Sequence, residues 1–532
     1  MLFDRVKPLD AILRTAEKKG LHRTLGAFQL TMLGIGGVIG TGIFVLTSEA
    51  AQKAGPGMLL SFVVAGFVCA VAALCYAELA SMVPVAGSAY TYTYAVVGEL
   101  LAWMVGWALI LEYAVGASAV AVGWSNHVVG LMRGLGVDFP TALSNADAFN
   151  AKVLLAFGAA PTPDLMTALN SGGWINVPAI IVAAVVTWLL IIGTTESARV
   201  NAILVAIKIA ALTAFVALTV PVMHAENFHP FLPTGGAGVF GAAASIFFAY
   251  VGFDAVSTAA EETKNPQRNV PIGLIASLAI CTLFYLAVAS GAIGAIGAQP
   301  LMAGGAVLAP GSAEMAGRCA SVVAGGALEP LVCSKEALVH ALNAIGWPAI
   351  GRLVGLAAVI ALPSVVLIMM YGQTRVFFTM ARDGLLPERL ASIHPRFRTP
   401  HVVTLVTGIA AAIAAAFLPV GKLADYSNSG TLFAFGMVAV SVLVLRRIDP
   451  ARRRPFRCPA VYVVAPLSII GCIGLYVSLP LTAILVLPGW GILGLLIYFL
   501  YSRTRSHVGR GMMDGMETTA YTDREPQAPG TR

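Results

Sequence analysis

Residues 34–42 read Gly-Ile-Gly-Gly-Val-Ile-Gly-Thr-Gly and lie inside an apolar stretch that is long enough to cross a membrane. Five glycines in nine residues disfavour a continuous helix. Two interpretations are open from this stretch alone: close helix packing through small residues, or an unwound segment whose backbone groups line a cavity. A dinucleotide-binding loop is disfavoured, because no strand precedes the stretch and Ile39 stands where that motif requires glycine.

A second interruption falls within the apolar stretch 238–262, where residues 247–254 read Phe-Phe-Ala-Tyr-Val-Gly-Phe-Asp. A glycine and a carboxylate in the middle of an apolar helix indicate a break. Interrupted helices in corresponding positions of two halves of a chain are typical of transporters with inverted repeats and a binding site at the middle of the membrane. The pair of breaks therefore favours a cavity-lining segment at residues 34–42.

The composition is that of a polytopic membrane protein. Charged residues make up 11% of the 532 residues, compared with about 25% in soluble domains. Hydrophobic residues reach 58%, and the mean hydropathy is +0.83. A soluble enzyme, a disordered protein and a nucleic-acid binder are excluded, although the net charge is +7. The twelve expected spans are 28–52, 58–83, 90–129, 174–195, 200–221, 238–262, 271–297, 348–380, 401–419, 426–445, 459–481 and 483–502.

We therefore predict an all-α bundle of twelve transmembrane helices, built from two inverted repeats of five helices with helices 1 and 6 broken. The boundary between the last two spans is expected at Pro480 and Thr482. The expected segments are a cytoplasmic N-terminal segment (1–27), the first repeat (28–221), the second repeat (238–445), two accessory helices (459–502) and a disordered cytoplasmic tail (503–532).

The distribution of basic residues predicts the orientation. With the N-terminus inside, 25 of the 33 Lys and Arg residues fall in cytoplasmic segments and 7 in outer segments, which places both termini in the cytoplasm. No cleavable signal peptide is expected, because residues 1–27 lack an early apolar region. The seven cysteines show no metal-ligand spacing. Cys319 and Cys333 share the outer loop 298–347, and a disulfide between them is an open alternative if that face is oxidising.

Several motifs, in order along the chain, resemble those of the amino acid–polyamine–organocation (APC) superfamily, and within it the cationic amino acid transporter family. The matching stretches are Gly34–Phe44, Cys75–Tyr94, Phe247–Asp254, Glu261–Pro271, Tyr371–Pro387 and Arg454–Pro459. The resemblance implies a leucine-transporter-type (LeuT-like) fold, amino acid transport by alternating access, and no cofactor. Twelve spans resemble the bacterial members, which implies a bacterial inner membrane.

The resemblance also implies a site made of backbone groups. Helix N-termini suit the substrate carboxylate, and unwound carbonyls suit its ammonium group. The implied carboxylate-binding amides are those around Gly40, Thr41 and Gly42. The implied ammonium-binding carbonyls are those of Val38, Phe248 and Val251, with Ala249 between the last two as a further substrate contact.

Lys208 is the most informative side chain, because no other ionisable residue lies between Arg199 and His224. A lysine within a span is a functional candidate, although snorkelling to the interface is the alternative. Arg199 marks that interface nine residues earlier, about 13 Å along a helix. In the related proton-coupled transporters a lysine in the fifth span stands in for a sodium ion. Our hypothesis is therefore proton coupling through Lys208.

Three further residues within spans have two interpretations each. Asp254 either caps the second half of the broken sixth helix or takes part in gating and proton linkage. Glu112 either lines the substrate pocket, where it would favour a cationic side chain, or contacts a packing partner. Met369 either shapes the side-chain end of the pocket or packs in the core.

The sequence thus predicts a secondary active amino acid transporter, with proton symport as the leading mechanism. An exchanger, a channel and a substrate-sensing receptor of the same fold are the alternatives. An enzyme and a primary pump are disfavoured, because metal-ligand spacing of histidines and a P-loop are both lacking. The expected partners are an amino acid, protons and membrane lipid, with no nucleic acid and no metal. The choice between cationic and small neutral substrates, and a small accessory membrane subunit, are left open.

Overall fold

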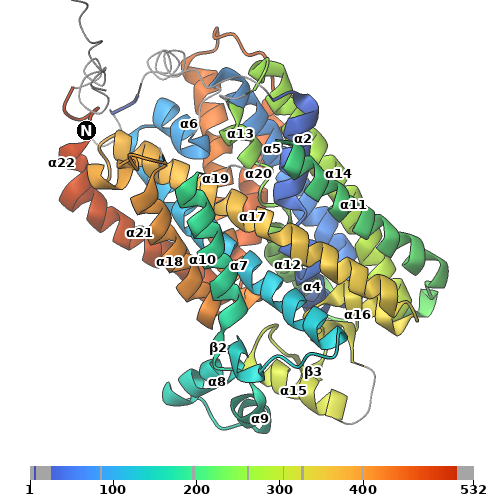
Figure 1. Ribbon diagram of the computed structural model, residues 1–532. Helices are drawn as coiled ribbons and strands as arrows, with labels where there is room; N and C mark the ends of the chain where they lie inside the picture. The colour runs from blue at the N-terminus through green and yellow to red at the C-terminus, as the bar shows by residue number, and fades with distance from the viewer. Residues whose placement is uncertain are drawn as a thin grey trace, which may run out of the picture.

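The computed structural model describes residues 5–7, 25–83, 87–193, 198–260, 263–303, 305–324, 329–397 and 399–511. These residues form mostly helices, which run side by side as an elongated bundle (Figure 1). The bundle helices are α2 (Ala27–Val38), α3 (Thr41–Phe44), α4 (Leu46–Ala54), α5 (Met58–Met82), α6 (Ser88–Val96), α7 (Glu99–Gly134), α10 (Val177–Ile192), α11 (Ala198–Thr219), α12 (Gly235–Ile246), α13 (Ala255–Thr258), α14 (Pro266–Ile296), α17 (Pro348–Arg382), α18 (His401–Phe417), α19 (Val420–Ile448), α20 (Val461–Val477) and α21 (Leu481–Ile497).

Length and composition mark the chain as a multi-pass membrane protein. Within the described residues, seven helical stretches are long and apolar enough to cross a membrane, and five shorter apolar helices accompany them. Helix α7 lies at the centre, with 83% of its most apolar window buried inside the protein, whereas only 22% of the corresponding window around α21 is buried. The predicted all-α membrane bundle is therefore confirmed at this level.

The expected third span, 90–129, is wrong as a single helix. The chain divides there into α6 and α7, which meet at Val97 and Gly98. Gly98 has a φ of +117°, a conformation that residues with a Cβ rarely adopt. The expected turn at Pro480 and Thr482 also shifts: the turn lies at 478–480, and Thr482 is inside α21.

Both expected helix breaks are present. Helix α2 ends at Val38, and Ile39 has an extended ψ of 93° before α3 begins at Thr41. In the second half, α12 continues as a 3₁₀ turn, η5 (Phe247–Tyr250), and the chain then leaves the helix at Val251, with a ψ of 137°. A four-residue turn leads to α13.

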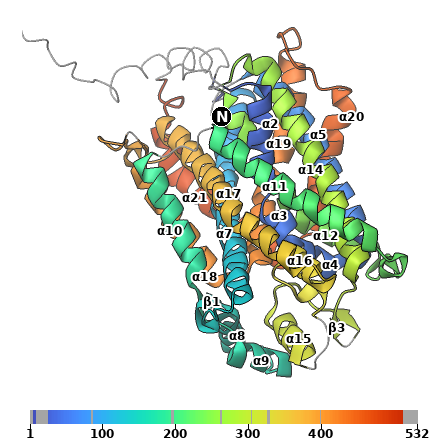
Figure 2. The ribbon, with the colours of Figure 1, turned by 45° about the vertical axis from the view of Figure 1, so that its right-hand side comes forward.

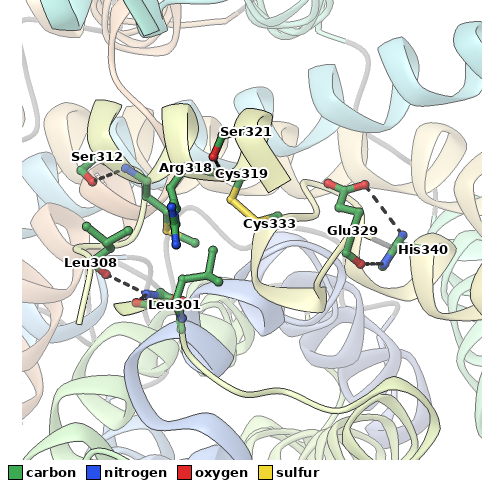
Figure 3. Close-up of a disulfide and its surroundings, with 11 residues drawn as sticks. Leu301, Leu308, Ser312, Arg318, Cys319, Ser321, Glu329, Cys333 and His340 are labelled. Atoms are coloured by element: carbon green, nitrogen blue, oxygen red, sulfur yellow. Dashed lines mark hydrogen bonds and ion pairs between the residues drawn. A yellow bond between two sulfur atoms is a disulfide. The ribbon is translucent and has the colours of Figure 1, made fainter. Parts of the chain in front are cut away.

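Smaller elements cover one end of the bundle (Figures 1 and 2). They are α8 (Asp147–Ala156), α9 (Pro163–Ser171), α15 (Ala313–Ala324), α16 (Ala337–Ala344), and the short antiparallel pairs β1 (Ser144–Asn145) with β2 (Ile175–Asn176) and β3 (Met302–Ala303) with β4 (Ala306–Val307). A disulfide between Cys319 and Cys333 links α15 to the turn η7 (Leu331–Cys333) (Figure 3). The pairing that the sequence left open is thus present.

The opposite end of the bundle joins both ends of the described chain (Figure 1). The buried carboxylate of Glu99 accepts hydrogen bonds from Arg5 at 3.1 Å, Tyr94 at 3.0 Å and Tyr498 at 2.9 Å, and also from Ser506. The short helix α22 (Arg503–Arg505) and the following turn are therefore packed against the bundle, and ordered chain extends beyond the expected end at residue 502. Residues 512–532 and most of 1–24 lie outside the described residues.

Candidate functional site

The two helix breaks touch each other through their backbones. A Cβ built on Gly252, whose φ is +116°, would lie 2.8 Å from the carbonyl carbon and oxygen of Gly37. A Cβ built on Gly42 would lie 2.3 Å from the Cα and Cβ atoms of Ala249. Glycine is thus required at these positions because two main chains meet there. Small-residue packing and helix interruption, the two interpretations of residues 34–42, therefore both apply.

Tyr285 of α14 connects the two breaks. Its hydroxyl lies 2.7 Å from the carbonyl oxygen of Val38 and 2.7 Å from that of Ala249. A hydroxyl carries one proton, so it donates to one of these carbonyls at a time. Sequence reasoning missed Tyr285; the available signal was a phenol in the middle of the apolar span 271–297.

The backbone groups that the resemblance implied lie at this same junction. Gly40 precedes α3 and packs against Val365 of α17, where a Cβ on Gly40 would come within 3.3 Å. The amides of Thr41 and Gly42 belong to the first turn of α3, in which N–H groups lack acceptors within the helix. The carbonyl of Phe248 accepts a hydrogen bond from the amide of Val251 at 3.2 Å.

Side chains from three elements, α17, α19 and η5, gather around Gly116 of α7. A Cβ built on Gly116 would lie 3.3 Å from Ser427 Oγ of α19, 3.5 Å from the Phe248 ring and 3.7 Å from Met369 Sδ of α17. Phe248 and Met369 are both buried. The residues packed around Gly116, next to the second break, thus present mainly apolar atoms.

Glu112 lies one helical turn before Gly116, on the same face of α7. Its side chain is fully buried, and neither carboxylate oxygen has a hydrogen-bond partner among the described residues. The Ser427 hydroxyl donates instead to the backbone carbonyl of Glu112, at 2.9 Å. A buried carboxyl without a donor is costly, and such groups occur at functional positions.

Asp254 is also fully buried, beside the second break. Its carboxylate accepts a hydrogen bond from the Tyr113 hydroxyl at 2.6 Å and from the Gly252 amide at 3.3 Å. Its side chain makes no capping hydrogen bond to α13, which is against the capping alternative. Asp254 instead ties the turn at Gly252 to α7.

Lys208 of α11 contacts the first break. Its ammonium group donates a hydrogen bond to the carbonyl oxygen of Gly36 at 2.8 Å, and the residue is only 1% exposed. Gly36 belongs to the last turn of α2, where the helix dipole favours a cation. The snorkelling alternative does not hold, because the side chain is directed into the protein.

On the side of the breaks that faces α8 and α15, polar contacts close the bundle. Lys53 of α4 lies 3.4 Å from the Asp425 carboxylate of α19, and Ser245 of α12 is hydrogen-bonded to both. A cavity of about 290 Å³ lies on this side of the bundle, lined in part by Val45, Glu49 of α4 and Cys333.

A polytopic helical bundle in which two interrupted helices meet at a buried polar junction defines a membrane transporter. A family model described as amino acid permease matches residues 25–498. The chain belongs to the amino acid permease family, within the APC superfamily that the motifs indicated. It is accordingly an amino acid transporter and not an enzyme.

Three relatives illustrate the range of the family. The chain is 42% identical to the branched-chain amino acid permease BcaP of Bacillus subtilis (strain 168), covering 96% of this chain and 99% of that protein. It is 40% identical to the methylthioribose transporter of the same organism, over 94% and 98% of the two chains. It is 35% identical to the vacuolar cationic amino acid transporter 2 of Arabidopsis thaliana, over 84% of this chain and 63% of that protein.

Proposed function

We propose that the protein is a proton-coupled symporter of uncharged α-amino acids that works by alternating access in a bacterial cell membrane. The observation that carries this proposal is the contact between the two breaks, at Gly42 with Ala249 and at Gly37 with Gly252. Unwound backbone at the middle of a membrane protein is tolerated where it lines a site.

The proposal includes the twelve-span, five-plus-five arrangement. The seven long and five shorter apolar helices of the described chain support twelve spans. The breaks also support inverted repeats, because the first interrupts the first apolar helix and the second interrupts α12, which would open the second repeat. An odd number of helices in each repeat inverts the second relative to the first.

For substrate binding, we propose that the amides of Gly40, Thr41 and Gly42 hold the carboxylate. The ammonium group would replace the Tyr285 hydroxyl at the carbonyls of Val38 and Ala249, which are preorganised acceptors in a buried setting. This assignment leaves the Phe248 carbonyl, which already accepts the Val251 amide, in a secondary role.

The surroundings of Gly116 support an uncharged, branched side chain. Phe248 and Met369 present apolar atoms there, and the similar Bacillus protein is named for branched-chain amino acids. A second candidate is a cationic substrate, because the unpartnered carboxylate of Glu112 lies one turn away. Competition between labelled leucine and arginine, each tested against all twenty amino acids at two pH values, separates the two. The Glu112→Gln variant should lose arginine uptake alone if the second candidate is correct.

Proton coupling is assigned to Lys208, with Asp254 as a further candidate. Loss of the proton from Lys208 would weaken its hold on the Gly36 carbonyl and so release the last turn of α2. Proteoliposomes with an inward pH gradient should accumulate substrate, and Lys208→Met should abolish accumulation while leaving exchange. Sodium-dependent, pH-independent accumulation by the unaltered protein would contradict the proposal. Transport only against internal amino acid would support an exchanger, and binding without flux a receptor.

The orientation that we propose places both termini in the cytoplasm. The excess of basic residues supports it, and so does the disulfide at the opposite end, since disulfides persist on the oxidising side of a cell membrane. Reconstitution of the purified chain alone also tests the open question of an accessory subunit, because full activity would show that none is required.

A further inference from the structure

The connection between α19 and α20, residues 449–460, is unusually rich in arginine. Four arginines lie within it, at 452, 453, 454 and 457, and Arg446 and Arg447 lie in the last turn of α19. In Figures 1 and 2 this connection lies at the end of the bundle opposite α8, α9 and α15. Because it joins two apolar helices directly, it lies at the boundary between membrane and water.

Part of this basic cluster is used inside the protein. The buried carboxylate of Glu78, on α5, receives Arg446 at 2.7 Å and Arg454 at 3.1 Å, and it accepts a hydrogen bond from the Cys458 amide at 2.8 Å. Glu78 thus has a structural role, because it holds the connection against α5.

Arg454 also fixes the path of the connection. Its guanidinium donates to the carbonyls of Asp449 at 2.7 Å, Arg452 at 2.8 Å and Pro450 at 3.1 Å. Basic residues that serve only to set the orientation of a protein in the membrane do not require a folded loop. The loop is therefore organised beyond what insertion into the membrane demands.

Of the other four arginines, Arg452 is half-buried and lies 3.6 Å from Asp449, and three face outward. Arg447, Arg453 and Arg457 are exposed, and no ion pair is found for them within the described part of the chain. Exposed apolar side chains flank them: Ile448 is 68% exposed and Tyr462 is 65% exposed. Exposed apolar side chains beside free cations match the acyl and headgroup regions of a bilayer.

We propose that Arg447, Arg453 and Arg457 form a binding site for the headgroup of an anionic phospholipid, with Ile448 and Tyr462 against its acyl region. Positive charges held by a rigid loop complement a lipid phosphate. The flanking apolar side chains favour a lipid over a free anion. Each basic residue near an anionic membrane surface strengthens the attraction of a protein for that surface about fivefold. A variant that lacks two of the three arginines should therefore bind anionic lipid roughly 25-fold more weakly.

The test compares the paired variant Arg453→Gln/Arg457→Gln with Arg389→Gln/Arg396→Gln, which removes the same charge from two exposed side chains of another connection, 383–400. The purified full-length chain in neutral detergent is titrated with phosphatidylglycerol, with phosphatidylcholine and with inorganic phosphate, and its thermal unfolding midpoint is followed. This readout is independent of transport. The midpoint in phosphatidylcholine reports whether each variant is folded.

The proposal expects phosphatidylglycerol to raise the midpoint of the unaltered chain and of the Arg389/Arg396 variant at similar lipid concentrations. The Arg453/Arg457 variant should need roughly 25-fold more. Equal weakening in both variants would reduce the effect to general surface charge and overturn the site. An equal response to phosphatidylcholine, or a response reproduced by inorganic phosphate, would also overturn it.

Discussion

The hydroxyl of Tyr285 bonds to both helix breaks, so Tyr285→Phe isolates its contribution. The phenylalanine ring keeps the aromatic contacts with Phe62 and Tyr250, whose ring centroids lie 5.7 and 5.3 Å from that of Tyr285. The substitution removes one donor from two carbonyls, each 2.7 Å away. Leaving a buried acceptor unsatisfied costs about 1–3 kcal/mol.

This loss applies to the substrate-free protein, because a bound ammonium group would supply the missing donor. We therefore expect Tyr285→Phe to be less stable without substrate and to gain about 1–3 kcal/mol more than the unaltered protein on saturation with substrate. At constant intrinsic contacts, that gain corresponds to about 5- to 150-fold tighter apparent binding.

The assay is thermal unfolding in detergent with and without saturating leucine, together with direct binding of labelled leucine. Tyr476→Phe is the matched control, since it removes a hydroxyl that donates to the Ile484 carbonyl at 2.6 Å, away from the breaks. If Tyr285→Phe and the control give the same substrate-induced stabilisation, the ammonium does not replace the hydroxyl and the proposed position of the substrate is wrong.

Three further predictions concern different parts of the molecule. Gly42→Val should abolish leucine uptake, because the Cβ atom alone would lie 2.3 Å from the Ala249 backbone. The control Gly474→Val places its side chain in open space and should transport leucine normally. Leucine uptake by both variants would argue against the site. Burial raises the pKa of Glu336 from 4.5 to about 8, so stability should fall by up to about 4–5 kcal/mol as the pH rises through that range. Glu336→Gln should remove this dependence in unfolding measured at pH 5 and 9, and an unchanged pH profile would contradict it. Cys333→Ser should make the segment around α15 more sensitive to protease while leucine uptake continues, because the disulfide closes a loop outside the bundle. Loss of uptake in this variant would show that the loop shapes the transport path.

The helix breaks could be predicted because glycine and a mid-helix carboxylate leave a direct mark on the sequence. The apolar spans could be predicted for the same reason, since length and hydropathy determine them locally. The division between α6 and α7 was missed because one glycine at φ +117° interrupts an otherwise uniform apolar stretch. The role of Tyr285 was also missed, since it depends on two carbonyls that are 247 and 36 residues away along the chain. Such a contact is a property of tertiary packing and has no local pattern.

The Glu99 cluster bears on how the chain is made. Its carboxylate is fully buried, and its donors come from residues 5, 94, 498 and 506. Two of these four donors are translated about 400 residues after Glu99. The carboxylate therefore lacks half of its hydrogen-bond donors during most of the synthesis of the chain. A chain truncated before residue 498 would bury a charge with only half of its donors, at a cost of several kcal/mol. Premature termination products that lack residues 498–506 should therefore be unstable and rapidly degraded.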